Sequence, residues 1–116
     1  MKDMDGILNN LKLMGGVRNV LLVSTSGAYI GGEAPKNVHL ETFTTMSAIL
    51  LGAAHTATKE LGDRLGHVEV NLENSKILIH PAGSKALLVL NVEKSGNIGE
   101  IMKRSAEVGR EIGRML

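Results

Sequence analysis

The sequence predicts an α+β fold, an α/β/α sandwich in which a five-stranded antiparallel sheet carries helices on both faces. The predicted elements follow one another as helix, strand, strand, helix, strand, strand, strand, helix. The turns between consecutive strands are short, and a parallel pair would need a longer crossover, so neighbouring strands must be antiparallel. With 116 residues, of which 43 % are hydrophobic and 22 % charged, the chain is predicted to form one globular domain, residues 1–116.

The first part of the chain predicts a helix followed by a hairpin. Apolar residues at helical spacing favour a helix from Asp3 to Met14, which Gly15-Gly16 ends. The apolar stretch from Val17 to Ser24 is typical of a strand that is buried on both faces. A tight turn at Thr25-Ser26-Gly27 then leads into a second strand, Ala28-Tyr29-Ile30.

A long helix is predicted from Val38 to Leu65, with Asn37 as its N-cap. One apolar stripe at helical spacing consists of Phe43, Leu50, Ala54, Ala57 and Leu61. The remaining directions are filled by Met46, Ala48, Ile49, Leu51 and Ala53. A small domain covers only one face of a surface helix, so the second apolar face predicts a partner. An exposed face near the N-terminus of this helix is expected for Thr42, Thr44, Thr45 and Ser47.

The last part of the chain predicts three strands and a helix. Alternating apolar residues indicate a half-buried strand from His67 to Leu72, and Lys76 to His80 is the next strand. After a turn at Pro81-Ala82-Gly83, the most apolar strand runs from Ala86 to Val92, which places it at the centre of the sheet. Asn97 and the glutamate three residues later form a capping box at the start of the final helix. The predicted core stripe of that helix is Ile98, Ile101, Met102, Ser105, Val108, Ile112 and Met115.

No motif indicates catalysis, a cofactor or a metal. Neither Gly15-Gly16 nor Gly31-Gly32 has the spacing of a nucleotide-binding loop, and no Gly-x-Ser-x-Gly elbow is present. The chain has no cysteine, and no two of its four histidines lie at metal-ligand spacing on one helix. We therefore predict no catalytic residue, no cofactor and no metal ligand. His55, within the apolar part of the long helix, is interpreted as a rim or interface histidine that makes one hydrogen bond.

Charge and composition argue against nucleic acids and membranes as partners. The formal net charge is +1, and aromatic residues make up 2 % of the chain, which leaves no stacking surface for bases. The longest apolar runs fall far short of the roughly 20 residues that span a bilayer. The first residues lack the apolar core of a signal peptide. We expect a cytoplasmic protein that does not insert into membranes.

The pattern as a whole resembles the Roadblock/dynein light chain family, including the bacterial and archaeal members that regulate Ras-like GTPases. The matching segments are Gly16-Val17 with Val20-Leu21-Leu22-Val23, the hairpin Ser26 to Ile30, the alanine-rich long helix, Val68 to Leu72, Ile77 to Gly83, Leu87 to Val92 and the capped last helix. They cover nearly the whole chain. One departure is Ser26-Gly27, where many members carry an acidic residue before the glycine, but both sequences suit a turn.

The resemblance implies the strand order 2-1-5-4-3, with the long helix on one face and the two terminal helices on the other. It also implies a dimer in which the third strands of two copies pair and the long helices pack together. The strand from His67 to Leu72 is then an open edge, and open edges tend to be covered or paired. The predicted interface consists of Met46, Ala48, Ile49, Leu51, Gly52, Ala53, His55, Val68, Val70 and Leu72.

By the family pattern, the resemblance implies a non-enzymatic platform that binds a small Ras-like GTPase and regulates it, by scaffolding or by modulating its nucleotide turnover. Its partners would be a second copy, or a related Roadblock protein, and the GTPase itself. The alternative is a small-molecule-sensing domain or a general protein-interaction domain. A sensor requires a pocket lined by convergent polar groups, and the densely aliphatic strands show no such set.

Overall fold

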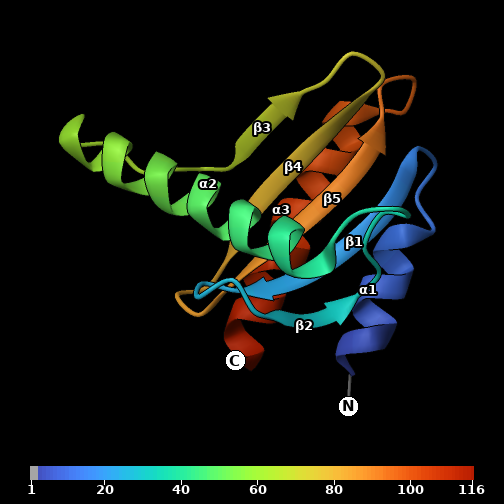
Figure 1. Cartoon of the computed structure of the whole chain (residues 1–116), viewed down its shortest axis with the longest axis horizontal. Coiled ribbons are helices and arrows are strands. Elements are labelled where there is room, and N and C mark those ends of the chain that lie inside the picture. The colour runs from blue at the N-terminus through green and yellow to red at the C-terminus, as the bar shows by residue number, and fades with distance from the viewer. Residues whose placement is uncertain (1–2) are drawn as a thin grey trace.

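The computed structural model of the protein describes residues 3–116, and its elements follow the predicted order (Figure 1). The helices are α1 (Met4–Lys12), α2 (Leu40–Glu60) and α3 (Ile98–Met115). The strands are β1 (Val17–Ser24), β2 (Tyr29–Gly32), β3 (Val68–Asn71), β4 (Ser75–Ala82) and β5 (Ala86–Glu93).

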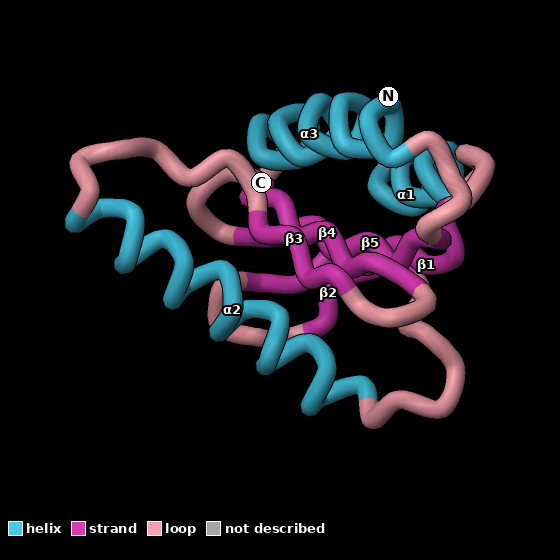
Figure 2. Tube along the Cα trace, turned by 90° about the horizontal axis from the view of Figure 1, so that it is seen from above, coloured by secondary structure: helices cyan, strands magenta, loops and turns pink. Residues whose placement is uncertain are grey.

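The five strands form one antiparallel sheet in the order β2-β1-β5-β4-β3. This confirms the predicted strand order, and β5 occupies the centre as its apolar sequence indicates. Figure 2 shows the three layers: α2 lies on one face of the sheet, and α1 and α3 lie on the other. The predicted α/β/α sandwich is therefore confirmed.

The larger core lies between the sheet and the two terminal helices. It contains Leu8, Leu11, Val20, Leu22, Leu78, Leu88, Leu90, Ile101, Val108 and Ile112, among others. The predicted N-cap of α3 is confirmed, because Oδ1 of Asn97 accepts the backbone N–H of Glu100 at 3.2 Å, and Oε2 of Glu100 accepts a hydrogen bond from the side-chain amide of Asn97 at 3.4 Å. The predicted core stripe of α3 holds along most of the helix, but Met115 at its end is 43 % exposed.

The contact between α3 and β4 is made partly by backbone. A Cβ atom added at Gly109 would lie 2.8 Å from the carbonyl oxygen of Pro81, and one added at Gly113 would lie 2.6 Å from the backbone nitrogen of Gly83. One turn earlier along α3, Oγ of Ser105 lies 2.7 Å from Nε2 of His80, and both side chains are buried. The distance between α3 and this end of β4 is thus limited by backbone atoms, which cannot rearrange as a side chain can.

A smaller core lies between the sheet and α2. Its buried residues are Leu21, Val23, Leu51, Ile79, Leu87 and Val89, with Phe43, Ala48 and Leu65 packed against them. The buried residues of α2 itself are Thr44, Ser47 and Leu51. Only one of these three is a large apolar side chain, so α2 covers its face of the sheet thinly.

The predicted bounds and cap of the long helix are wrong. α2 begins at Leu40 instead of Val38, and its N-cap is His39, whose Nδ1 accepts the backbone N–H of Thr42 at 3.3 Å. Asn37 has a φ of 64° and belongs to the preceding turn, since asparagine adopts this left-handed conformation more readily than most residues. The helix ends at Glu60, and Gly62 follows with a φ of 68°, a common way to stop a helix.

The expected exposure of the hydroxyl-bearing residues is wrong for Thr44 and Ser47, which are 1 % and 4 % exposed. Each hydroxyl donates a hydrogen bond to a carbonyl of the preceding helical turn, so both hydroxyls are satisfied although they are buried. Their small size lets the helix lie close to the first hairpin. There, a Cβ atom at Gly27 would be 3.1 Å from Cα of Thr45.

Two strands are longer than predicted. β4 continues through Pro81 and Ala82, which the sequence placed in a turn. β4 pairs with β3 only as far as Ile79, so Pro81 lies where the strand has become an edge, and proline is tolerated at edges. β2 likewise includes Gly31 and Gly32, which pair with β1.

Replacing Gly109 with alanine tests the backbone contact between α3 and β4. The new Cβ must displace the carbonyl of Pro81, so we expect the free energy of unfolding to fall by ~1–3 kcal/mol. Gly99→Ala is the matched control, because the nearest atom to its Cβ would be Oδ1 of Asn97 at 3.8 Å. We expect that variant to match the parent or to exceed it by up to ~1 kcal/mol, since alanine favours helix. Equal stability of the two variants in urea denaturation would contradict the close contact.

Burial of His80 predicts a pH dependence of stability. Desolvation, with the nearby charges of His67 and Arg110, lowers the pKa of His80 from 6.5 to about 4. Between these values the unfolded chain binds the proton and the folded chain does not, so stability is lost as the pH falls. We expect His80 to account for on the order of 3 kcal/mol over this range. Urea denaturation at intervals from pH 7 to pH 4 should show a weaker decline for His80→Gln than for the parent, and parallel declines would refute this origin.

Candidate functional site

The solvent face of α2 carries an exposed apolar stripe. We call it the outward stripe, and it consists of Met46, Ile49, Leu50, Ala53 and Ala57. Met46, Ile49 and Leu50 are 51 %, 54 % and 44 % exposed. Met46, Leu50, Ala53 and Ala57 follow one another at steps of four, three and four residues, the spacing at which apolar side chains form a seam between two packed helices.

α2 presents large apolar side chains toward solvent as well as toward the sheet. The predicted stripe of Phe43, Leu50, Ala54, Ala57 and Leu61 is not one face, because Phe43 packs against the smaller core whereas Leu50, Ala57 and Leu61 are exposed. The sheet side instead buries two hydroxyl-bearing residues beside Leu51. A helix that only covers its own domain presents polar side chains to solvent, so the outward stripe has the character of a contact surface.

The C-terminal turns of α2 extend past the sheet. Figures 1 and 2 both show the end of the helix beyond the outline of the strands, with residues 61–67 returning to β3. Leu61, which follows the helix, is 79 % exposed. The helix therefore offers apolar surface that its own sheet does not reach.

β3 is an edge of the sheet, as predicted, and within residues 3–116 it pairs with β4 alone. Val68 and Val70 are half-buried, and Val68 packs against the smaller core on the α2 side. The intervening Glu69 points to the opposite face, because side chains alternate along a strand. The ammonium group of Lys76 holds the pKa of the Glu69 carboxyl below its ordinary value, and the ring of His67 makes a smaller contribution in the same direction. The edge is thus apolar toward α2 and charged on its other face.

The structure separates the ten predicted interface residues into three groups. Exposed on α2 are Met46, Ile49, Gly52, Ala53 and His55, and the edge strand with the residue after it supplies Val68, Val70 and Leu72. Ala48 and Leu51 pack instead against the smaller core of their own chain, where Leu51 is 8 % exposed. The sequence prediction omitted Leu50 and Ala57. Their four-three-four spacing from Met46 was the available signal, but apolar residues on every side of the helix obscured it.

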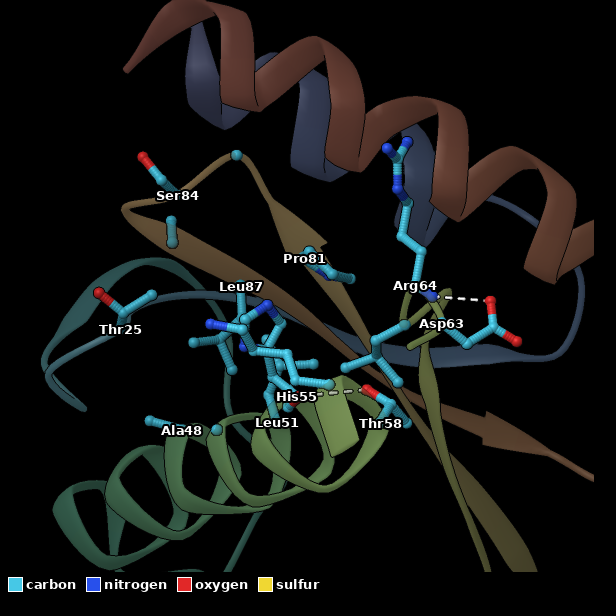
Figure 3. A pocket seen from close by; sticks show the side chains of 15 residues that line it. Thr25, Ala48, Leu51, His55, Thr58, Asp63, Arg64, Pro81, Ser84 and Leu87 are labelled. Atoms are coloured by element: carbon cyan, nitrogen blue, oxygen red, sulfur yellow. Dashed lines mark hydrogen bonds between the residues drawn. The ribbon is translucent and has the colours of Figure 1, made fainter. Parts of the chain in front are cut away.

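The flank of α2 that carries His55 borders a cleft between the helix and the sheet (Figure 3). No helix in the described part of the chain is long and apolar enough to cross a membrane. Nor do three histidine, aspartate or glutamate side chains gather within residues 3–116 as they would around a metal ion.

Known proteins share both the sequence pattern and the fold. The model of the Roadblock/LC7 domain family matches residues 4–91. Protein MJ0714 of Methanocaldococcus jannaschii is 33 % identical over 107 residues, which cover 89 % of this chain and 90 % of that protein. The matched region extends from α1 almost to the end of β5, so it includes the outward stripe and the β3 edge.

Solved structures have the same arrangement of elements. The Roadblock/LC7 domain from Streptomyces avermitilis has a TM-score of 0.86 at 14 % identity, covering 98 % of both chains. A structure described as MglB with a tetrameric arrangement has a TM-score of 0.84 at 24 % identity, covering 94 % of this chain and 84 % of that chain. Together with the match of sequence over residues 4–91, this fold establishes that the chain belongs to the Roadblock/LC7 domain family.

Proposed function

We propose that this protein is a non-enzymatic homodimeric platform that binds and regulates a small Ras-like GTPase. The observation that carries the proposal is the outward stripe, an apolar helix face that lies beside an open sheet edge. Met46, Ile49 and Leu50 are each about half exposed, whereas the sheet side of the same helix buries Thr44 and Ser47. This distribution is expected of a helix that contacts a second chain.

The proposed dimer joins two copies through α2 and β3. Small residues on the exposed side of the helix, Gly52 and Ala53, would allow two helix backbones to approach closely, and a Cβ atom at Gly52 would have no atom within 4 Å. Pairing of β3 with the same strand of a second copy would satisfy its outer backbone groups. A two-fold axis brings identical surfaces together, which suits a self-complementary seam. The tetrameric arrangement described for MglB supports self-association as a property of this fold.

The proposal of a GTPase partner rests on the family resemblance. No residue of the outward stripe carries a titratable or nucleophilic side chain, so any effect of this surface on GTP hydrolysis would act through the conformation of the partner. A related Roadblock protein could replace one copy in the dimer. The cytoplasmic location expected from the sequence belongs to the same proposal.

Introducing a charge into the outward stripe should dissociate the dimer. We expect the parent protein to sediment as a dimer at micromolar concentration, and Ile49→Glu to sediment as a folded monomer, because the new carboxylate would be buried without a partner. Leu13→Glu is the matched control, since Leu13 is 81 % exposed and lies after α1 on the opposite face of the sheet. A monomeric parent, or a dimeric Ile49→Glu variant, would refute the proposed interface.

The GTPase proposal is tested by mixing the protein with each small Ras-like GTPase of the same genome. Size-exclusion chromatography in the presence of GDP or a non-hydrolysable GTP analogue should show a complex in at least one nucleotide state. The Ile49→Glu variant should fail to form it, and the Leu13→Glu variant should form it normally. If no GTPase formed a complex in either nucleotide state, the GTPase role would be overturned. The sedimentation experiment tests the dimer separately.

A further inference from the structure

Two histidine rings meet where the loop after α2 enters the edge strand. His67 is the last residue before β3, and His80 lies on β4, one position beyond the paired residues Val68 and Ile79. The ring centroids of His67 and His80 are 5.3 Å apart, and the ring planes are tilted by 33°. The two rings thus pack against each other, and their contact joins the loop to the sheet at the point where β3 begins.

The ring of His80 is also held by α3. His80 is 3 % exposed, and its Nε2 lies 2.7 Å from Oγ of Ser105, which is fully buried. A hydroxyl group has one hydrogen, and Oγ of Ser105 donates it to the carbonyl oxygen of Ile101 at 2.6 Å. Nε2 of His80 must therefore carry a hydrogen and donate it to Ser105. This leaves Nδ1 of His80 as the nitrogen that can take up a further proton.

A proton on His67 is accommodated by the edge strand itself. Nε2 of His67 lies 3.5 Å from Oε2 of Glu69, whose other carboxylate oxygen pairs with Lys76 of β4. The side chain of His67 is 32 % exposed, so water also solvates the added charge. His67 is therefore the ring of the pair that takes the first proton.

A proton on His80 finds no such support. Desolvation lowers the pKa of His80 from 6.5 to about 4, together with the charges of His67, from the loop, and Arg110, from α3, which both face its ring. On β5 the residue opposite His80 is Leu88, which is apolar and fully buried. Two cationic rings at this distance repel each other, so the second proton favours a state in which His67 has moved away and water reaches His80.

We infer that the His67–His80 pair is a pH-sensitive switch, which holds the start of β3 against the sheet while His80 is neutral and releases it when both rings are protonated. The part that moves is the segment that carries His67. Residues 61–67 form neither helix nor strand, and β3 pairs with β4 through four residues, whereas segments with few contacts open with a lower free energy than the core. Because β3 is an edge of the proposed dimer, acid would also weaken the dimer. That consequence rests on the proposed function, but the opening of β3 does not.

The sign and the size of the effect follow from the binding of the proton. In the open state His80 is in water and binds a proton near its ordinary pKa of 6.5, whereas in the closed state its pKa is about 4. Between these values the open state binds more protons, so opening is favoured as the pH falls. The equilibrium constant for opening should therefore rise by up to about tenfold for each pH unit.

Amide exchange of the full-length protein measures this opening. We would follow the β3 amides that bond to β4 by ¹H–¹⁵N spectroscopy from pH 7 to pH 4.5, as protection factors that remove the pH dependence of the intrinsic exchange rate. Protection in β3 should be lower than in β1, should fall by up to about tenfold for each pH unit, and should not respond to low concentrations of urea. Equal protection in the two strands, or the same response to urea, would mean that β3 opens only with the whole protein and would overturn the inference.

Three variants separate the ring pair from other effects of acid. In His80→Gln the group that takes the second proton is absent, so protection in β3 should lose its pH dependence. His67→Gln changes a half-buried position and removes the neighbouring charge, so the titration midpoint of the His80 ring, followed by its ¹H–¹³C resonances, should rise. His39→Asn is the matched control, because it removes a histidine at the N-cap of α2 and keeps a capping side chain, and it should retain the response of the parent. An unchanged pH dependence in His80→Gln, or an unmoved His80 midpoint in His67→Gln, would overturn the inference.

Discussion

The architecture depends on covering the central strand β5 on both faces. Ala86 to Leu90 are at most 1 % exposed, because β5 lies between β1 and β4 and has helices above and below it. α1 and α3 cover one face densely, with large aliphatic side chains and glycine contacts to β4. α2 covers the other face with Leu51, the half-buried Phe43 and small residues, and on this face Val68 and Ile77 are only half-buried. This difference between the two faces leaves apolar surface on the α2 side of the molecule.

The layering and the antiparallel pairing could be predicted from the residues, because hydrophobic periodicity and short turns constrain them strongly, whereas the full strand order was implied by the family resemblance. The apolar run Ala86 to Val92 indicated a central strand, and Asn97 with Glu100 located the start of α3 correctly. The rotation of α2 about its own axis could not be predicted, because residues suited to burial occur in every direction around it. In the structure the sheet side of α2 includes Thr44 and Ser47. Their hydroxyls donate to carbonyls of their own helix, so these side chains can be buried. A burial scale that counts them as polar would place them on the solvent side.

The same ambiguity explains why some of the predicted interface residues are exposed and others belong to the core. The predicted interface included Met46, Ile49 and Ala53, whose side chains are exposed on α2. It also included Leu51, which is part of the chain's own core. The cleft was not foreseen, since its polar groups come from segments that only the fold brings together. α2 therefore has three sides with different chemistry: a small-residue side toward the sheet, an apolar side toward solvent, and a flank with His55 and Lys59 toward the cleft.

The overhang of α2 beyond the strands has a consequence for local stability. Hydrogen bonds in the last helical turn, before Leu61, are supported by few side-chain contacts within the chain, and such segments open with a lower free energy than the core does. A partner seated on the outward stripe would add contacts there and nowhere in the α1–α3 layer. Amide exchange at residues 57–61 would then slow with protein concentration, while exchange in β5 would not change. The amide exchange rate at the end of α2 would therefore report the association of the protein with a partner.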